Sequence, residues 1–185
     1  VALNRPVDEP LAKNISKKFV EIIIANNFDK KALEVFKKKK RLILIKFNKS
    51  RLDQMYEIKS INGGYLKQEK NLTKIDKRLL VQASNYKSKL SQLDDLIFAL
   101  KICKHVKSNA IVLCKNKKTI GIGAGQMSRI DACKIALKKC NKKQKQGGFV
   151  AASDAFFPFT DNIRLLLKNS CKAIVEPSGS INDEK

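Results

Sequence analysis

Helix-like and strand-like patterns alternate along this chain, and the alternation constrains its fold more than any other feature of the sequence. Residues 11–20 carry apolar side chains at helical spacing, and residues 21–25 then form a short apolar run rich in β-branched side chains. A second helical pattern at 30–39 precedes a second apolar run at 41–46. The order helix–strand–helix–strand predicts an α/β layer with parallel strands.

The second half of the chain is predicted to be α/β as well. Asn62 and Gly63 predict a hairpin turn, and the polar residues 69–86 are interpreted as a connector between two domains, at 1–85 and 86–185. The other expected elements are helices at 91–103, about 128–140 and 162–168, strands at 109–114, 119–123, 149–152 and 173–175, and a basic loop at 142–148.

Two local signals predict where helices begin. Asp29 is expected to cap the helix that follows it, because a short acceptor side chain satisfies the first backbone N–H groups of a helix. Ser91 with Asp94 three residues later resembles a capping box, so the third helix is expected to begin there.

The composition restricts the class of protein. The chain has 185 residues, 43% of them hydrophobic, which suffices for one sizeable domain or for two subdomains that share a core. No apolar run approaches the roughly 20 residues of a membrane span, and the first residues show no secretory signal pattern. The five cysteines include no C-x-x-C pair, so we expect reduced thiols in a cytoplasmic protein and no zinc site.

The formal net charge of +22 leaves open a Lys-rich nucleic-acid-binding module as an alternative function. Only six of the 39 basic residues are Arg, the residue that best recognises phosphates and base edges. The lysines are scattered, and aromatic and basic residues do not interleave as in an RNA-recognition motif. This pattern argues against nucleic acid as a partner.

Three segments place polar groups at predicted strand ends and helix starts, where α/β proteins bind ligands: 107–109, 121–129 and 153–161. The glycines of the second segment allow a ligand to approach the backbone, and Ser128 with Arg129 opens a helix, which suits an anion. The alternative is an ordinary Gly-rich turn with a capping Ser. The phenylalanines of the third segment are either core residues or an aromatic wall for a planar ligand. His105, the single His, is interpreted as a structural residue beside a helix end.

Four blocks of sequence, in this order, resemble the AICAR transformylase domain of the bifunctional purine-biosynthesis enzymes. They are Lys-Ser-Asn-Ala-Ile-Val at 107–112, Thr-Ile-Gly-Ile-Gly-Ala-Gly-Gln-Met-Ser-Arg at 119–129, Ser-Asp-Ala-Phe-Phe-Pro-Phe at 153–159 and Pro-Ser-Gly-Ser-Ile-Asn-Asp at 177–183. Segments within 1–25 and the Asn-Gly-Gly turn at 62–68 resemble the same domain, so the resemblance covers essentially the whole chain.

The resemblance implies a fold and an activity. Members of this family transfer a formyl group from 10-formyltetrahydrofolate, a cosubstrate, to the amino group of AICAR, an aminoimidazole carboxamide ribonucleotide. The product FAICAR is closed to IMP by an IMP cyclohydrolase domain in the same polypeptide. The implied fold is a pair of cytidine-deaminase-like three-layer α/β subdomains without zinc, and the implied assembly is a homodimer with active sites at the interface.

The resemblance also assigns residues. It implies a catalytic role beside the reacting carboxamide and amine for Asn109, whose amide both donates and accepts hydrogen bonds. The expected AICAR-binding residues are Glu21, Asn109, Arg129 and Phe156; the expected folate-binding residues are Ile130, Asp161 and Ser180; and Ser108 and Asp154 match a potassium site of some members.

Two parts of the family pattern are absent from these 185 residues: a catalytic Lys-His pair, which belongs before Val1, and a closing Arg-His-Phe segment. The resemblance therefore implies an internal fragment of the transformylase domain that is inactive by itself, since the oxyanion formed in formyl transfer needs a donor and the amine needs a base. A catalytically dead, dimerising relative of the family remains a further alternative.

Overall fold

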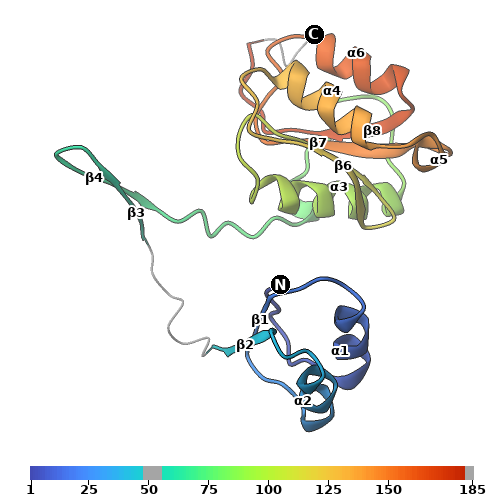
Figure 1. The fold of residues 1–185 in the computed structure, drawn as a ribbon. Helices are drawn as coiled ribbons and strands as arrows, with labels where there is room; N and C mark the ends of the chain where they lie inside the picture. Colours follow the sequence, from blue (N-terminus) through green and yellow to red (C-terminus); the bar gives the residue numbers. More distant parts are fainter. Residues whose placement is uncertain (48–55, 182–185) are drawn as a thin grey trace. The chain divides into compact units, whose positions relative to one another are not determined.

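The computed structural model describes residues 1–47 and 56–181, and it divides the chain into two compact units, Val1–Leu72 and Thr73–Lys185 (Figure 1). The expected boundary near residue 85 concerns the family's subdomains and stays a prediction. Residues 182 and 183 of the fourth resembling block lie outside the described residues.

The first unit contains the expected helix–strand–helix–strand order. Its elements are α1 (Glu9–Ser16), β1 (Ile22–Ala25), α2 (Lys30–Lys37) and β2 (Ile43–Lys46). β1 and β2 pair in parallel with Ile22 opposite Ile43, which confirms the predicted parallel layer. The two helices pack over Ile23 and Ala25, which are fully buried in a core that includes Ala12 and Phe36.

Helix α1 begins and ends earlier than its apolar spacing predicts. Asp8 caps it by accepting the Leu11 N–H at 2.9 Å, and Pro10 occupies the first turn, where no hydrogen-bonding N–H is needed. The predicted helical residue Phe19 lies beyond the helix and is 90% exposed. Asp29 is the N-cap residue of α2 as expected, although its side chain makes no capping hydrogen bond.

The predicted hairpin is present as β3 (Tyr56–Ile61) and β4 (Gly64–Glu69), which pair antiparallel from Tyr56↔Glu69 to Ile61↔Gly64. Asn62 and Gly63 form the turn between them, and Gly63 has a φ of +79°, a conformation that glycine adopts without strain. Every residue of both strands is exposed.

The second unit is built on one four-stranded sheet in the order β6-β5-β7-β8 (Figure 1). Strand β5 runs antiparallel to both of its neighbours, and β7 and β8 are parallel. Along the chain the elements are η2 (Lys77–Leu79), α3 (Leu90–Cys103), β5 (Ile111–Lys115), β6 (Lys118–Gly123), α4 (Arg129–Lys139), α5 (Lys142–Lys145), β7 (Phe149–Ser153), α6 (Asp161–Lys168) and β8 (Cys171–Val175).

Helices cover both faces of this sheet (Figure 1). Successive side chains of a strand point to opposite faces, and β5 shows this alternation directly. Ile111 and Leu113 are fully buried in a core with α4 and α6, while Val112 and Cys114 belong to a second core with α3. The α/β class is therefore confirmed, and the mixed α/β architecture is consistent with a transformylase-type domain.

Two local predictions in this unit are wrong. Ser91 and Asp94 do not open α3: its N-cap residue is Lys89, whose N–H donates to the Gln92 side chain at 2.7 Å. The predicted basic loop at 142–148 contains α5, because Asn141 and Gln144 cap each other reciprocally, each backbone N–H donating to the other side chain at 2.9 Å.

The glycines of β6 serve packing. A Cβ added at Gly123 would meet the Ala132 carbonyl oxygen at 1.9 Å, and one added at Gly121 would meet the Ala136 carbonyl oxygen at 2.1 Å. Helix α4 thus lies directly against the backbone of β6, which no larger residue permits. At these two positions the structure favours close helix packing over ligand approach. Within the described part of the chain, no helix is long and apolar enough to span a membrane.

Candidate functional site

The functional segments of the second unit meet at one edge of its sheet. Because β5 is antiparallel to its neighbours, its first residue, Ile111, pairs with Gly123 at the end of β6 and with Ser153 at the end of β7. At the same edge, Val175 at the end of β8 pairs with Ala152. The chain segments that precede β5 and follow β6, β7 and β8 therefore lie together, although the sequence separates them widely.

Asn109 is fixed in this cluster by its own amide. Its Nδ2 donates to the Gln126 carbonyl at 2.9 Å and to the Met127 carbonyl at 3.2 Å, and its backbone N–H also donates to Gln126 at 3.2 Å. Both side-chain N–H groups are thus engaged with the segment between β6 and α4. The side-chain oxygen, Oδ1, has no hydrogen bond to any described residue, so this atom is the one that the fold leaves available to accept a hydrogen bond from a ligand.

Arg129 and Asp154 form an ion pair at the same edge. The Arg129 Nη1 lies 2.5 Å from Asp154 Oδ1, and the two side chains are only 13% and 10% exposed. Arg129 is the first residue of α4, and Asp154 directly follows β7. The Asp154 Oδ1 also accepts the Ala110 N–H at 2.9 Å, so this one carboxylate ties the start of β5 to α4.

The surroundings of Asp154 keep it ionised. Burial raises the pKa of this carboxyl, but hydrogen bonds from Ser108, from the Ala110 N–H and from Arg129 lower it by more, so the pKa lies below its ordinary value. The carboxylate therefore compensates the charge of Arg129 at neutral pH. Arg129 therefore lies in the site as one partner of an ion pair whose net charge is close to zero.

The start of α4 is occupied by a group of the chain itself. The Ser128 Oγ accepts the Asp131 N–H at 3.2 Å and donates to Asp131 Oδ2 at 2.6 Å. This cap satisfies part of the helix N-terminus and places a negative charge beside it. The helix start, considered as an anion site, thus already carries the chain's own carboxylate.

The phenylalanine segment is divided between core and surface. Phe157 is 5% exposed and belongs to the core with α4 and α6, whereas Phe156 and Phe159 are 40% and 70% exposed. The segment after β8 lies against it: a Cβ on Gly179 would sit 3.8 Å from the Phe156 ring, and the Phe157 N–H donates to the Glu176 carboxylate at 2.6 Å. One ring is therefore structural, and the exposed Phe156 ring is available to a planar ligand.

The three residues expected to bind folate are spread over three elements of the second unit. Ile130 is half-buried in the first turn of α4, Asp161 is exposed at the start of α6, and Ser180 is half-buried after β8. The Asp161 Oδ1 accepts the Asn162 N–H at 2.7 Å and its Nδ2 at 3.0 Å. Burial raises the pKa of the Cys133 thiol on α4 to about 12, and the negative charge of Asp161 adds to the shift.

Glu21 belongs to the first unit. It is exposed, and its backbone carbonyl accepts the Ile43 N–H at 2.8 Å where β1 begins to pair with β2. Its part in a site with the residues of the second unit stays a prediction.

At Ser108 and Asp154, where potassium is expected, the chain's own groups already hold one carboxylate oxygen, and the potassium site stays a prediction. The Asp154 Oδ1 is already bound by a guanidinium and a backbone N–H, and a cation placed beside it would be repelled by Arg129. No three His, Cys, Asp or Glu side chains gather within 1–47 and 56–181 in a way that would hold a metal ion. All five cysteines are buried as free thiols.

Three participants were not singled out from the sequence. The Gln126 carbonyl accepts two hydrogen bonds from Asn109, Ser153 is fully buried with its Oγ donating to the Ala155 carbonyl at 2.6 Å, and Glu176 holds the Phe157 N–H. Ser153 is the last residue of β7, and Glu176 directly follows β8. Their positions at these strand ends are the sequence feature that could have predicted their role. The role of Gln126 is a backbone role, so its residue type gives no signal.

The chain matches one known protein family over most of its length. Residues 1–139 match the model of the AICARFT/IMPCHase bienzyme family. The chain belongs to this family. The matched residues include Asn109 and Arg129, two side chains that are hydrogen-bonded at this sheet edge.

Curated relatives of this AICARFT/IMPCHase chain agree with the family match. It is 46% identical over 188 residues to the bifunctional purine biosynthesis protein PurH of Prochlorococcus marinus (strain MIT 9215) and 47% identical over 184 residues to that of Fusobacterium nucleatum subsp. nucleatum. A third PurH, from Thermoanaerobacter sp. (strain X514), is 44% identical over 183 residues. These alignments cover 99–100% of this chain, but the chain spans only 35–36% of the length of these relatives.

Proposed function

We propose that this chain forms part of a bifunctional purine-biosynthesis enzyme and contributes to its AICAR transformylase site. The reaction is transfer of a formyl group from 10-formyltetrahydrofolate to the amino group of AICAR, which gives FAICAR, and the whole protein also carries IMP cyclohydrolase. One observation carries the proposal: the segments that give the chain its resemblance to this family, around Asn109, Arg129, Phe156 and Ser180, meet at one edge of the β6-β5-β7-β8 sheet.

Asn109 has a defined role in this reaction. Its Nδ2 is held by two backbone carbonyls, so its Oδ1 is presented as an acceptor. An acceptor beside the AICAR amine orients the nitrogen lone pair toward the formyl carbon and receives an N–H hydrogen bond as the nitrogen becomes positive. Asn109 therefore orients the amine only as a hydrogen-bond acceptor, since its amide N–H groups already donate to backbone carbonyls.

Arg129 and Phe156 bind the nucleotide. The exposed Phe156 ring offers an apolar face to the imidazole. Arg129 is positioned by Asp154, and its remaining guanidinium N–H groups serve as donors to the nucleotide while the carboxylate holds the fork in place. Ile130, Asp161 and Ser180 are proposed folate contacts, and Glu21 stays an expected AICAR contact.

The oxyanion of the tetrahedral intermediate needs a hydrogen-bond donor. Asn109 does not supply one, because its amide N–H groups already donate to the Gln126 and Met127 carbonyls. In the family this falls to a catalytic Lys-His pair that none of these 185 residues matches, since the His of Lys104-His105 does not correspond to the catalytic His. We therefore expect the 185-residue chain by itself to have no formyltransferase activity. We further propose two cytidine-deaminase-like subdomains, a homodimer and a cytoplasmic location for the whole protein.

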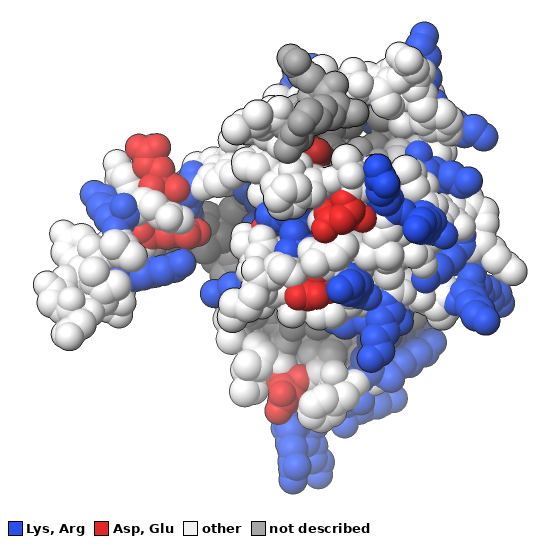
Figure 2. Space-filling model, turned by 90° about the horizontal axis from the view of Figure 1, so that it is seen from above, with Lys and Arg blue, Asp and Glu red and all other residues white. Residues whose placement is uncertain are grey.

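A nucleic-acid module is the weaker alternative. Figure 2 shows Lys and Arg spread over the visible face, with Asp and Glu between them, and not gathered into one stripe. Among the described residues, Lys77 and Lys117 both pair with Asp94, and Arg78 pairs with Asp76. Part of the basic charge is thus compensated locally, which lowers the field that a phosphate backbone would meet.

A chimeric enzyme tests the proposal. Residues 1–185 replace the aligned segment of the P. marinus PurH, which supplies the rest of the polypeptide, and formyl transfer to AICAR is measured. We expect an active chimera in which Asn109→Ala lowers kcat by about 10²-fold, while Asn85→Ala, at an exposed position, does not. Amide hydrogen exchange in β5 and β7 of the same chimera reports whether the exchanged segment folds. A chimera whose exchanged segment folds but which transfers no formyl group refutes the proposal and favours a catalytically dead relative.

A further inference from the structure

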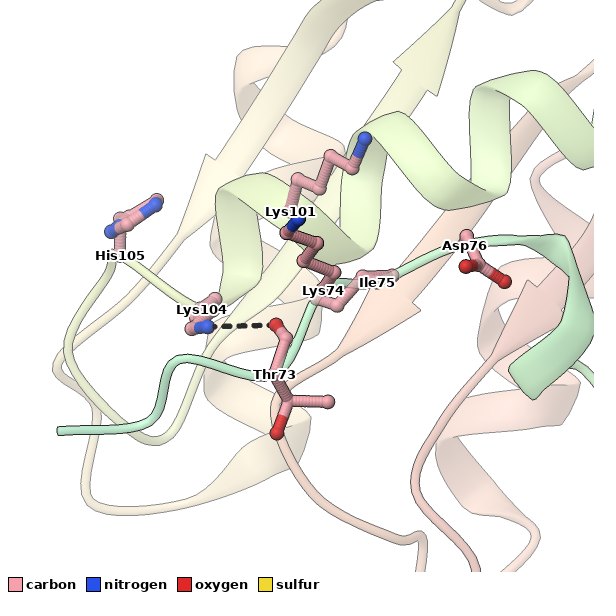
Figure 3. Close-up of a pocket in the computed structure, with 7 residues that line it drawn as sticks. All are labelled: Thr73, Lys74, Ile75, Asp76, Lys101, Lys104 and His105. Carbon is pink, nitrogen blue, oxygen red and sulfur yellow. Dashed lines mark hydrogen bonds between the residues drawn. The ribbon is translucent and has the colours of Figure 1, made fainter. Parts of the chain in front are cut away.

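A hollow of about 420 Å³ lies in the second unit, apart from the residues assigned to formyl transfer (Figure 3). One wall is the extended segment that begins the unit, and the other is the last turn of α3 with the residues that follow it. The hollow is lined by Thr73, Lys74, Ile75, Asp76, Lys101, Lys104 and His105. This volume is within the usual range of small-molecule sites.

Lys104 fixes the two walls to each other. Its Nζ donates to the Thr73 carbonyl at 3.1 Å, the bond drawn as a dashed line in Figure 3. This bond ties the extended segment to the end of α3 across the hollow. The walls are therefore joined by a specific contact, and Ile75 adds a half-buried apolar surface between them.

The charge of the lining is strongly positive. Asp76, the one carboxylate among the lining residues, is bound by the Arg78 guanidinium at 2.7 Å and by a second nitrogen at 3.2 Å, which also lowers the pKa of the carboxyl. The nearby Asp94 is shared by Lys77 and Lys117. Lys74 and Lys101 form no ion pair with any described residue, although the charge of Lys101, after that of Arg78, helps to lower the pKa of the Asp76 carboxyl.

The end of α3 does not cancel this charge. A helix C-terminus carries about half a negative charge, whereas three ammonium groups line the hollow. The hollow contains no Arg, so it lacks the planar fork that binds a single phosphate or carboxylate bidentately. Several lysine ammonium groups lining one hollow suit an anion that carries two or more consecutive charged groups.

We propose that this hollow binds a small polyanion, a molecule with consecutive phosphate or carboxylate groups, between Lys74 and Lys101. Such groups occur in a polyphosphate chain and in an oligo-γ-glutamate chain, which share the chemistry that lysines recognise. The site differs from a single exposed lysine because three lysines, Lys74, Lys101 and Lys104, line one hollow. It does not depend on the proposed formyl transfer.

Isothermal titration of the 185-residue chain with tripolyphosphate and, separately, with γ-linked triglutamate tests the site. We expect saturable 1:1 binding of at least one of them, weakened when NaCl rises from about 50 to about 500 mM. The double substitution Lys74→Gln/Lys101→Gln should weaken binding at least about tenfold, and Lys74→Arg/Lys101→Arg should retain it. The better ligand of the two identifies the anionic group.

The matched control removes the same charge from another surface. Lys138→Gln/Lys139→Gln lies on α4, which packs against the other face of the sheet, and it should change the affinity by less than about twofold. Equal losses in the two double variants would mean that the overall charge of +22 attracts the ligand, and the site would be abandoned. The absence of saturable binding to either compound would overturn it as well.

Discussion

The buried pair of Arg129 and Asp154 makes the sharpest prediction about this fold. Asp154→Ala removes the counterion of a guanidinium that is only 13% exposed and the acceptor of the Ala110 N–H, a fully buried residue. Loss of one partner of a buried ion pair costs about 3–5 kcal/mol, and an unsatisfied buried N–H costs about 1–3 kcal/mol. The two losses share one environment and do not simply add, so we expect the second unit to lose about 4 kcal/mol.

Two companion variants separate the contributions. Asp154→Asn keeps an oxygen for the Ala110 N–H and removes only the charge, so it should destabilise the unit by about 2–3 kcal/mol. Arg129→Met combined with Asp154→Asn leaves no buried charge uncompensated and should be more stable than Asp154→Ala. The exposed pair of Lys134 with Asp131 provides the control, and Lys134→Gln should leave stability unchanged.

Amide hydrogen exchange read by mass spectrometry is the suitable assay, because the chain has no Trp and exchange in β5 and β7 reports on the second unit alone. The charge also sets a pH dependence. Folding lowers the pKa of Asp154, so the ionised carboxylate stabilises the folded state fully at pH values above its unfolded pKa near 4. This stabilisation is lost as pH falls through the folded pKa. The difference in the free energy of unfolding between wild type and Asp154→Asn should therefore narrow below about pH 4. A change in β5 protection of less than about 1 kcal/mol in Asp154→Ala at pH 7 would refute the argument.

Three further predictions concern packing, burial and hydrogen bonding. Gly123→Ala should destabilise the second unit by several kcal/mol in urea unfolding, because its Cβ would overlap the α4 backbone. Gly64→Ala should have little effect, because no atom lies within 4 Å of the added Cβ, and equal unfolding midpoints of the two variants would contradict the packing. Cys103, whose pKa burial raises to about 12, should not react with a maleimide at pH 8 until urea unfolds the chain, and rapid native labelling would contradict its burial. Asp95→Ala should cost about 1–3 kcal/mol by chemical denaturation, because its carboxylate accepts two backbone N–H groups of the β5–β6 turn at 2.9 and 2.6 Å; an unchanged midpoint would show that water replaces it.

Sequence patterns predicted the elements best where local chemistry decides them. The apolar runs at 21–25 and 41–46 contain the strands β1 and β2, and the Asn62-Gly63 pair is a hairpin turn, because each depends on side chains within a few residues. Helix starts were harder, since several polar residues compete to cap the same turn. Lys89 and Gln92 cap α3 in place of Ser91 and Asp94, and Asn141 makes a helix of a segment that composition alone describes as a basic loop.

The sequence by itself determined the α/β class, most of the elements and the family, since these depend on periodicity and on blocks such as 119–129 that are contiguous in the chain. The tertiary structure decided what the site residues do. Only the antiparallel register of β5 brings Asp154 to Arg129 and Ala110, and only the path between β6 and α4 engages the Nδ2 of Asn109 and leaves its oxygen as the acceptor. These contacts join residues far apart in sequence, and no local pattern encodes which partner a donor will meet.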